Sequence, residues 1–138
     1  MFLSTHKVQV LWHDCDPAAI VFYGNYYRWM DDATYYLFVK ADLEWNKLKT
    51  IYDKPSVPLV SAHGDFRSPA KFGDVLTIES HVSEWGTRSF TVSHVFHNGD
   101  KIAAEGYEKR VWCRVDPNDP GNIKAFPIPD EVRKALGG

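Results

Sequence analysis

The sequence has 138 residues, of which 44% are hydrophobic and 25% are charged, and its formal net charge is -2. These values are typical of one globular domain, spanning residues 1–138, that buries about two-thirds of its unfolded surface, and they exclude an intrinsically disordered chain. The slight excess of acidic residues argues against nucleic acid as the main partner.

The N-terminal part of the chain is predicted to hold one strand and one long helix. Residues 6–13 alternate between apolar and polar side chains, which is typical of a half-buried strand. An acidic, turn-prone loop follows. Apolar or small side chains then recur on one helical face from Tyr26 to Ala41. This spacing predicts a helix of about 17 residues, roughly 25 Å long, with Gly24 and Asn25 as its cap.

The rest of the chain is predicted to be mostly antiparallel sheet. Residues 42–57 are mixed and polar, and we expect a connection there with room for one extra helical turn. The period-two pattern then predicts strands over residues 58–67, 75–85, 88–97 and 101–115. Asn98 and Gly99 favour a tight hairpin turn. We expect an exposed loop over 116–122 and a short helix after Pro129.

This order of elements predicts an α+β fold. The long helix must bury its apolar face, and the antiparallel sheet is the only large surface that can cover it. We therefore expect a five-stranded antiparallel sheet to wrap around one long helix. The sheet would leave aromatic and apolar surface uncovered, which predicts self-association.

The sequence also predicts a cytoplasmic protein. Its two cysteines, Cys15 and Cys113, lie far apart, so we expect free thiols rather than a disulfide framework. The first residues lack the basic and apolar regions of a signal peptide, and no apolar stretch is long enough to span a membrane. We accordingly expect no membrane partner.

Two motifs connect the sequence with a known family. The first reads Asp14-Cys15-Asp16-Pro17-Ala18-x-Ile20-Val21-x-Tyr23-x-Asn25-Tyr26, then Arg28-Trp29-x-Asp31. The second reads Phe66-x-x-Pro69-Ala70-x-Phe72-Gly73-Asp74-Val75-Leu76. These motifs resemble those of the hotdog-fold acyl-CoA thioesterases, most closely the 4-hydroxybenzoyl-CoA thioesterase family. The resemblance covers nearly the whole chain and is least clear across residues 42–57 and 98–122. It implies a hotdog fold and a homodimer, often paired into a homotetramer, with active sites at the subunit interface.

Hydrolysis of a thioester needs a carboxylate that attacks or activates water, and donors for the oxyanion that forms. The resemblance implies that Asp16 is this carboxylate, as nucleophile or as general base. It also implies that backbone N–H groups near Tyr23 and Gly24 polarise the thioester carbonyl, at a helix end where the dipole favours negative charge. The alternative is that Asp16 only forms an Asx turn before Pro17.

The other residues of the acidic loop are expected to be structural. Asp14 could act as the acid, but we interpret it as a loop or capping residue. Cys15 is flanked by acids that would raise the pKa of its thiol, so we expect it to be packed and inert. A metal ion held by His13 and its neighbours would need a further ligand such as His63, which no pattern specifies. We predict no metal and no cofactor, because coenzyme A would be part of the substrate.

Three further residues are assigned to the substrate by the resemblance. It implies that Asp31 lies by a phenolic hydroxyl of the acyl group, whereas its spacing alone favours an exposed acid paired with Arg28. It also implies that Arg88 and Lys124 bind the phosphates of coenzyme A, with Lys71 and Arg110 as weaker candidates. Val57 departs from the family pattern, because the family enzyme that we compare has a small polar residue there.

The leading hypothesis is an acyl-CoA thioesterase that converts an aromatic, hydroxybenzoyl-like or other compact acyl-CoA to the free acid and coenzyme A. One alternative is a hotdog hydratase or dehydratase, in which His13 or His63 would supply an imidazole for proton transfer. Another alternative is a non-catalytic module that binds acyl-CoA without turnover.

Overall fold

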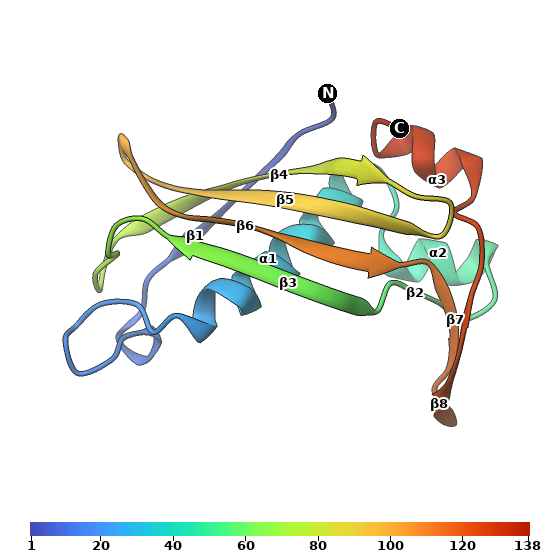
Figure 1. Cartoon of the computed structure of the whole chain (residues 1–138), viewed down its shortest axis with the longest axis horizontal. Coiled ribbons are helices and arrows are strands. Elements are labelled where there is room, and N and C mark those ends of the chain that lie inside the picture. The colour runs from blue at the N-terminus through green and yellow to red at the C-terminus, as the bar shows by residue number, and fades with distance from the viewer.

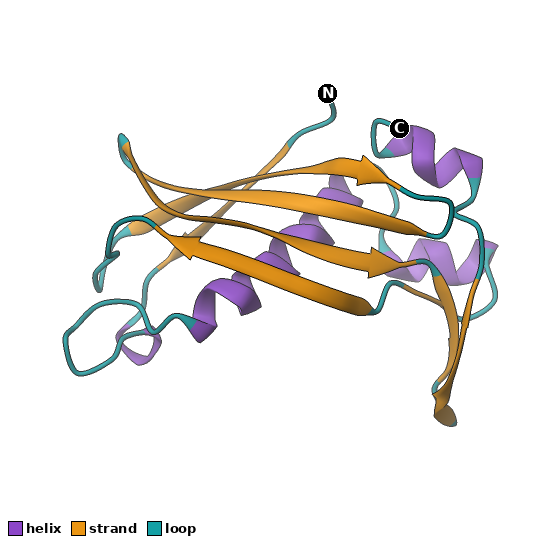
Figure 2. Ribbon diagram, in the orientation of Figure 1, coloured by secondary structure: helices purple, strands orange, loops and turns teal.

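The computed structural model describes residues 1–138, and Figures 1 and 2 show a long helix lying against a broad sheet. The strands are β1 (Ser4–Gln9), β2 (Pro55–Ser56), β3 (Leu59–Phe66), β4 (Val75–Trp85), β5 (Ser89–Asn98), β6 (Lys101–Val111), β7 (Cys113–Asp116) and β8 (Asp119–Ala125). The helices are α1 (Gly24–Lys40), α2 (Trp45–Ile51) and α3 (Asp130–Ala135), with a 3₁₀ turn η1 (Trp12–Asp14) before α1.

Five strands form the main sheet in the order β1-β4-β5-β6-β3, and every neighbouring pair is antiparallel. A smaller antiparallel sheet, β2-β7-β8, lies at one end (Figure 1). The α+β architecture and the five-stranded antiparallel sheet are therefore confirmed. The expectation of one long helix is only partly right, because the seven-residue α2 accompanies the 17-residue α1, whereas α3 is the short helix predicted after Pro129. None of the three helices has the length and hydrophobicity that a membrane span requires.

The predicted apolar stripe of the long helix is buried against the sheet. Tyr26, Met30, Ala33 and Leu37 are each at most 4% exposed. Burial of four such side chains on one face is the main reason that this segment stays helical and docked, since propensity alone seldom stabilises a helix.

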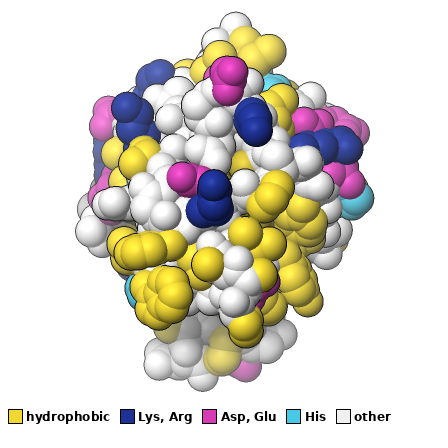
Figure 3. All heavy atoms as spheres, turned by 90° about the vertical axis from the view of Figure 1, so that its left-hand side faces the viewer, with side chains coloured by type: hydrophobic (Ala, Val, Ile, Leu, Met, Phe, Trp, Pro, Cys, Tyr) yellow, Lys and Arg dark blue, Asp and Glu magenta, His cyan; other side chains and the backbone are white.

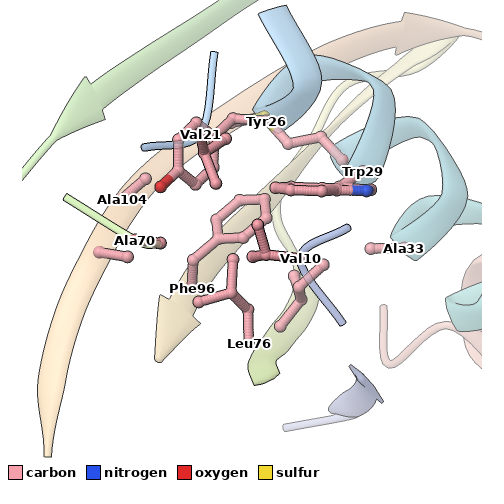
Figure 4. Packing of buried hydrophobic residues seen from close by; sticks show 12 residues of the cluster. Val10, Val21, Tyr26, Trp29, Ala33, Ala70, Leu76, Phe96 and Ala104 are labelled. Carbon is pink, nitrogen blue, oxygen red and sulfur yellow. The ribbon is translucent and has the colours of Figure 1, made fainter. Parts of the chain in front are cut away.

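The core next to the start of α1 is aromatic. The rings of Tyr26 and Phe96 meet edge to face with 5.1 Å between centroids, and Tyr26 meets Trp29 in the same way at 5.6 Å. Figure 4 shows Tyr26 and Trp29 of α1 on one side of this cluster and Phe96 and Leu76 of the sheet on the other. Edge-to-face pairs add to the stability gained from burial alone and fix the orientation of the rings.

A pair of glycines lets α1 come close to the sheet. Gly64 of β3 and Gly106 of β6 stand opposite each other in the register. A Cβ atom on Gly106 would lie 2.1 Å from the His63 carbonyl oxygen and 2.7 Å from the Met30 methyl group. Only glycine fits at this position, because a Cβ atom would collide with the backbone of β3 and with the Met30 methyl group of α1.

Several predicted boundaries are wrong for identifiable reasons. The first strand ends at Gln9 rather than at residue 13, because Leu11 N–H donates to Asp14 Oδ2 (2.8 Å) and the chain turns through η1. Trp12 is consequently 68% exposed. The expected connection over 42–57 contains the seven-residue helix α2.

The predicted strand over 101–115 is two strands. The chain leaves the main sheet after Val111, where Trp112 N–H donates to the Arg88 carbonyl (2.8 Å), and continues as β7 in the small sheet. The loop expected over 116–122 is exposed as predicted, but most of it belongs to strand β8, which pairs with β7.

Candidate functional site

The acidic loop is fastened to the start of α1 through Asp14. Its carboxylate is buried and accepts hydrogen bonds from Leu11 N–H (2.8 Å) and Arg28 Nη2 (2.9 Å). Its backbone carbonyl accepts from Asn25 Nδ2 (2.8 Å) and Phe22 N–H (2.9 Å). Asp14 thus has the structural role that we expected, although it is buried rather than solvated. The loop and the helix end form one rigid unit.

Asp16 presents a free carboxylate oxygen from this anchored loop. Its Oδ1 accepts from Ala18 N–H (2.8 Å), so the Asx turn expected from the sequence is present. The loop closes where Asp16 N–H donates to the Ile20 carbonyl (2.9 Å) and Ala19 takes a left-handed backbone conformation (φ 63°). Asp16 Oδ2 accepts no hydrogen bond from the protein. Because the turn engages only Oδ1, Oδ2 is available to act as a nucleophile or a general base.

The N-terminus of α1 presents two unpaired donors. The N–H groups of Tyr23 and Gly24 donate to no protein acceptor, whereas those of Asn25 and Tyr26 donate to the carbonyls of Phe22 (3.0 Å) and Tyr23 (3.1 Å). The cap predicted at Gly24-Asn25 is wrong, because Tyr23 precedes the helix and no side chain caps it. The two free N–H groups lie at the positive end of the helix dipole.

One cavity of about 530 Å³ brings Asp16 and the helix end together. It is lined by Asp16, Ile20, Val21, Phe22, Tyr23, Tyr26, Phe66, Arg67, Ser68, Pro69 and Ala70. Figure 3 views the end of the molecule where this loop and the start of α1 lie, and hydrophobic side chains gather over the lower part of that view. Burial, with the Asp74 charge, raises the pKa of Tyr26 to about 12, so its hydroxyl is neutral at physiological pH.

The environment of Cys15 does not favour the thiolate form that a nucleophilic cysteine requires. Burial and the carboxylates of Asp14 and Asp16 raise the pKa of its thiol. Both cysteines are free thiols, as predicted. The nearby His13 has its Nε2 atom 3.4 Å from Asp14 Oδ1. No group of three or more His, Cys, Asp or Glu side chains lies close enough together to bind a metal ion.

Asp31 lies in a different cavity on the same chain. This second cavity, of about 270 Å³, is lined by Asp31, Asp32, Thr34, Tyr35, Phe38, Trp45, Val57 and Arg110, and it shares no residue with the first. The expected pairing of Asp31 with Arg28 is wrong, because Arg28 binds Asp14. Asp31 Oδ1 instead accepts from Arg110 Nη2 (2.6 Å). Arg110 is only 7% exposed and is therefore unavailable as a surface contact for phosphates.

Sequence reasoning missed the buried polar cluster behind Asp31. Glu108 accepts hydrogen bonds from Arg110 Nη2 (2.7 Å) and Thr34 Oγ1 (2.5 Å), and it lies 3.3 Å from His94 Nε2. His94 Nδ1 is bonded in turn to Ser80 Oγ (2.7 Å). The signal was present, since Glu108 and Arg110 are two residues apart on one strand and so share its face.

The buried partners lower the pKa of Glu108 to about 2. Burial alone would raise this pKa, but the hydrogen bonds from His94, Arg110 and Thr34 and the Arg110 charge outweigh it. Burial likewise would lower the pKa of Arg110, and the partners Glu108 and Asp31 raise it instead. The pair is therefore ionised at neutral pH.

Stability should depend on pH through Glu108. Its pKa is lower in the folded chain than its ordinary value of 4.5, so the stabilisation is complete above that value and is lost as the pH falls toward 2. We expect Glu108 to account for about 2 kcal/mol of the loss in unfolding free energy between about pH 6 and pH 3. Urea unfolding at both pH values should show a smaller difference for Glu108→Gln. The matched variant Glu105→Gln, on the same strand but 41% exposed, should keep the wild-type difference, and an unchanged difference in Glu108→Gln would contradict the assignment.

The two predicted phosphate contacts lie far from Asp16 within one chain. Arg88 is exposed in the connection between β4 and β5, and Lys124 is exposed on β8 with its ammonium 5.4 Å from the ring centroid of Phe126. Figure 1 shows that connection and β8 at the right-hand end, whereas the loop that precedes α1 is at the left-hand end. One chain therefore brings together Asp16 and Tyr23, which is followed by Gly24 at the start of α1, but neither Arg88 nor Lys124.

Comparisons with known proteins agree with the motifs. A family model described as the thioesterase-like superfamily matches residues 10–136. The chain is 34% identical over 131 residues to the 4-hydroxybenzoyl-CoA thioesterase of Pseudomonas sp. (strain CBS-3), and the match covers 91% of each chain.

Two solved structures extend the similarity to the fold. One is a mutant 4-hydroxybenzoyl-CoA thioesterase complexed with 4-hydroxybenzoyl-CoA, with a TM-score of 0.89 at 28% identity over 99% of this chain and 100% of the other. The second is a gentisyl-coenzyme A thioesterase, with a TM-score of 0.83 at 32% identity over 97% of this chain and 100% of the other.

Proposed function

The chain belongs to the thioesterase-like superfamily of hotdog-fold proteins and is a thioester hydrolase, and on this basis we propose that it hydrolyses an aromatic, hydroxylated acyl-CoA to the free acid and coenzyme A. The relatives support the substrate class, since they act on 4-hydroxybenzoyl-CoA and gentisyl-CoA. The single observation that carries the proposal is the cavity lined both by Asp16, which has a free carboxylate oxygen, and by Tyr23, where the unpaired N–H groups at the start of α1 begin.

This geometry supports a simple mechanism. The thioester carbonyl oxygen accepts hydrogen bonds from the N–H groups of Tyr23 and Gly24, and the helix dipole stabilises the negative charge that develops there. Asp16 Oδ2 then attacks the carbonyl carbon or removes a proton from the water that does so. The carbon–sulfur bond breaks, and coenzyme A leaves as the thiolate, which takes up a proton. In the nucleophilic route, water hydrolyses the acyl–Asp16 anhydride and restores the carboxylate.

The hydratase alternative has no support in the site. His13 is 75% exposed at its side chain and lies against Asp14, outside the Asp16 cavity. His63 lies 3.1 Å from Asp65 and stacks on Tyr107, and it does not line the cavity either. No imidazole of the same chain therefore lines the cavity that contains Asp16.

We also propose that the site is shared between two chains. Within one chain, none of the three predicted substrate contacts, Asp31, Arg88 and Lys124, lines the 530 Å³ cavity that contains Asp16. The partner subunit's Asp31 would therefore contact the acyl group. The partner's Arg88 and the partner's Lys124 would contact the phosphates of coenzyme A. Apolar side chains near the free edge strand β3 and the helix start are uncovered, with exposures of 47–60% for Leu59, Val60, Phe66, Phe22 and Tyr23. Such a surface favours a homodimer, and a homotetramer would follow from pairing two dimers.

A substrate panel tests the proposed function. We expect coenzyme A thiol release, followed with a colorimetric thiol reagent, to give a kcat/KM at least about tenfold higher for 4-hydroxybenzoyl-CoA than for acetyl-CoA, because an aromatic ring buries more apolar surface in the site than a methyl group does. Benzoyl-CoA and phenylacetyl-CoA complete the panel. No thiol from any ester would contradict the proposal, and a change in crotonyl-CoA absorbance without thiol release would favour the hydratase.

A further inference from the structure

The ion pair between Glu108 and Arg110 is buried between α1 and the sheet. The two side chains are 3% and 9% exposed, and Thr34 and His94 complete the bonding of Glu108. Replacing a buried ion pair by apolar residues of similar volume is often neutral or stabilising, so stability alone gives no reason for this pair. A better explanation for the buried ion pair is that Glu108 fixes the orientation of the Arg110 side chain.

Arg110 is held in place before any ligand arrives. Four of its five N–H groups have protein acceptors. Its Nε and one Nη2 hydrogen point at Glu108 (3.3 and 2.7 Å), and Nη1 donates to the Val57 carbonyl (3.0 Å). The second Nη2 hydrogen goes to Asp31 Oδ1 (2.6 Å). Glu108 and Val57 therefore set the plane of the guanidinium, and the guanidinium sets the place of Asp31.

Asp31 would otherwise be a mobile surface carboxylate. Its side chain is 69% exposed, and the bond to Arg110 is its only hydrogen bond within the chain. That bond holds Oδ1 and leaves Oδ2 without a partner, on a residue that lines the second cavity. Fixing a recognition group in advance avoids the entropy loss of ordering it on binding.

The second cavity has the size and chemistry for one substituted ring. A cavity of about 150 Å³ already holds benzene, and this one measures about 270 Å³. Tyr35, Phe38 and Trp45 give it aromatic walls. An ionised carboxylate only accepts hydrogen bonds, so Asp31 Oδ2 selects a group that carries a proton to donate.

We propose that Arg110 is a positioning residue that aims Asp31 Oδ2 at the hydroxyl hydrogen of a hydroxylated aromatic acyl group, and that Glu108 holds Arg110 for this purpose. The inference rests on the proposed function, which supplies the aromatic acyl ester. It adds that the preference for a hydroxylated ring over a bare ring depends on a buried arginine of β6 that never touches the reacting thioester.

The test compares the affinities of two esters that differ by one hydroxyl. Calorimetry on the full chain carrying Asp16→Asn, which keeps the esters intact, gives dissociation constants for 4-hydroxybenzoyl-CoA and benzoyl-CoA. Adding Arg110→Lys should reduce the preference for the hydroxylated ester about tenfold, since one ammonium cannot bond Glu108, Val57 and Asp31 in this geometry. The double variant Glu108→Met with Arg110→Met, which leaves no buried charge unpaired, should reduce it equally. Arg114→Lys, at an exposed pair with Asp53, is the matched control and should keep the preference.

Each other outcome has a definite meaning. An unchanged preference in variants that unfold normally in urea overturns the inference, as does an equal loss of affinity for both esters, which would show a merely structural role. Failure of both esters to bind overturns it as well. Absence of thiol release by the wild-type chain would contradict the proposed function alone, because the calorimetric preference is measured without turnover.

Discussion

Asp16→Asn is expected to lower kcat for the best acyl-CoA substrate by about 100-fold or more, measured by thiol release. The amide can neither attack the thioester carbonyl nor take a proton from water. It retains an oxygen in the place of Oδ1, so the bond from Ala18 N–H and the shape of the loop are preserved. The unfolding free energy should therefore change little, and the loss would belong to the chemical step.

Cys15→Ala is the control for this experiment. The Cys15 thiol is held in its protonated form by burial and by the neighbouring carboxylates, and its Sγ lies 3.6 Å from the Leu11 carbonyl. The variant should keep most of the activity. Inactive Cys15→Ala together with active Asp16→Asn would reverse the assignment. If Asp16→Asn became active again slowly on storage, deamidation to aspartate should be checked by mass spectrometry.

Mixing two inactive variants is expected to restore about a quarter of the wild-type sites, because half of randomly re-formed dimers are mixed and each then holds one intact site. One variant is Asp16→Asn. The other is the triple variant Asp31→Ala, Arg88→Ala and Lys124→Ala, whose side chains are all exposed. In a mixed dimer, one site would combine a wild-type Asp16 with a partner that is wild-type at the other three positions. The measurement is thiol release after joint unfolding and refolding of the two chains.

The matched control is refolding of each variant with a differently tagged copy of itself, which should restore nothing. Native mass spectrometry shows whether mixed dimers form. Mixed dimers without recovered activity would place the whole site within one chain. A fully active chain that is a monomer by sedimentation would also contradict the proposal, because a monomer cannot form a site shared between two subunits.

The sequence predicted the elements whose hydrophobic period is regular. The long helix and strand β4 lie where their patterns indicated, because Met30, Leu37, Leu76 and Ile78 are buried at the expected spacing. The prediction failed where local bonds override the pattern. The turn at Trp12–Asp14 is one case, because the Asp14 carboxylate satisfies a backbone donor that a longer strand would have paired.

The candidate site was predictable where one segment carries it. Asp16 and Tyr23 are close in sequence, the resemblance of their segment to a known family pointed to both, and both line one cavity, whereas Gly24 is not among its lining residues. The strand pattern placed Glu108 and Arg110 on one face, but it could not show that this face is buried or that Arg110 bonds Asp31. Charged residues are normally exposed, and the partners that permit its burial come from α1, from the chain before β3 and from β6 itself. Only the folded chain brings these partners together.

The close packing at Gly64 and Gly106 has a consequence for the width of the reaction cavity. One wall, from Asp16 to Tyr26, leads into α1, whereas the other wall, from Phe66 to Ala70, follows β3. We expect a methyl group added at Gly106 to push β3 away from β6, because its Cβ would lie 2.1 Å from the His63 carbonyl oxygen of β3. Such a shift would move the β3 side of the cavity against the helix side, so the absence of a side chain at Gly106 would help to set the shape of the cavity.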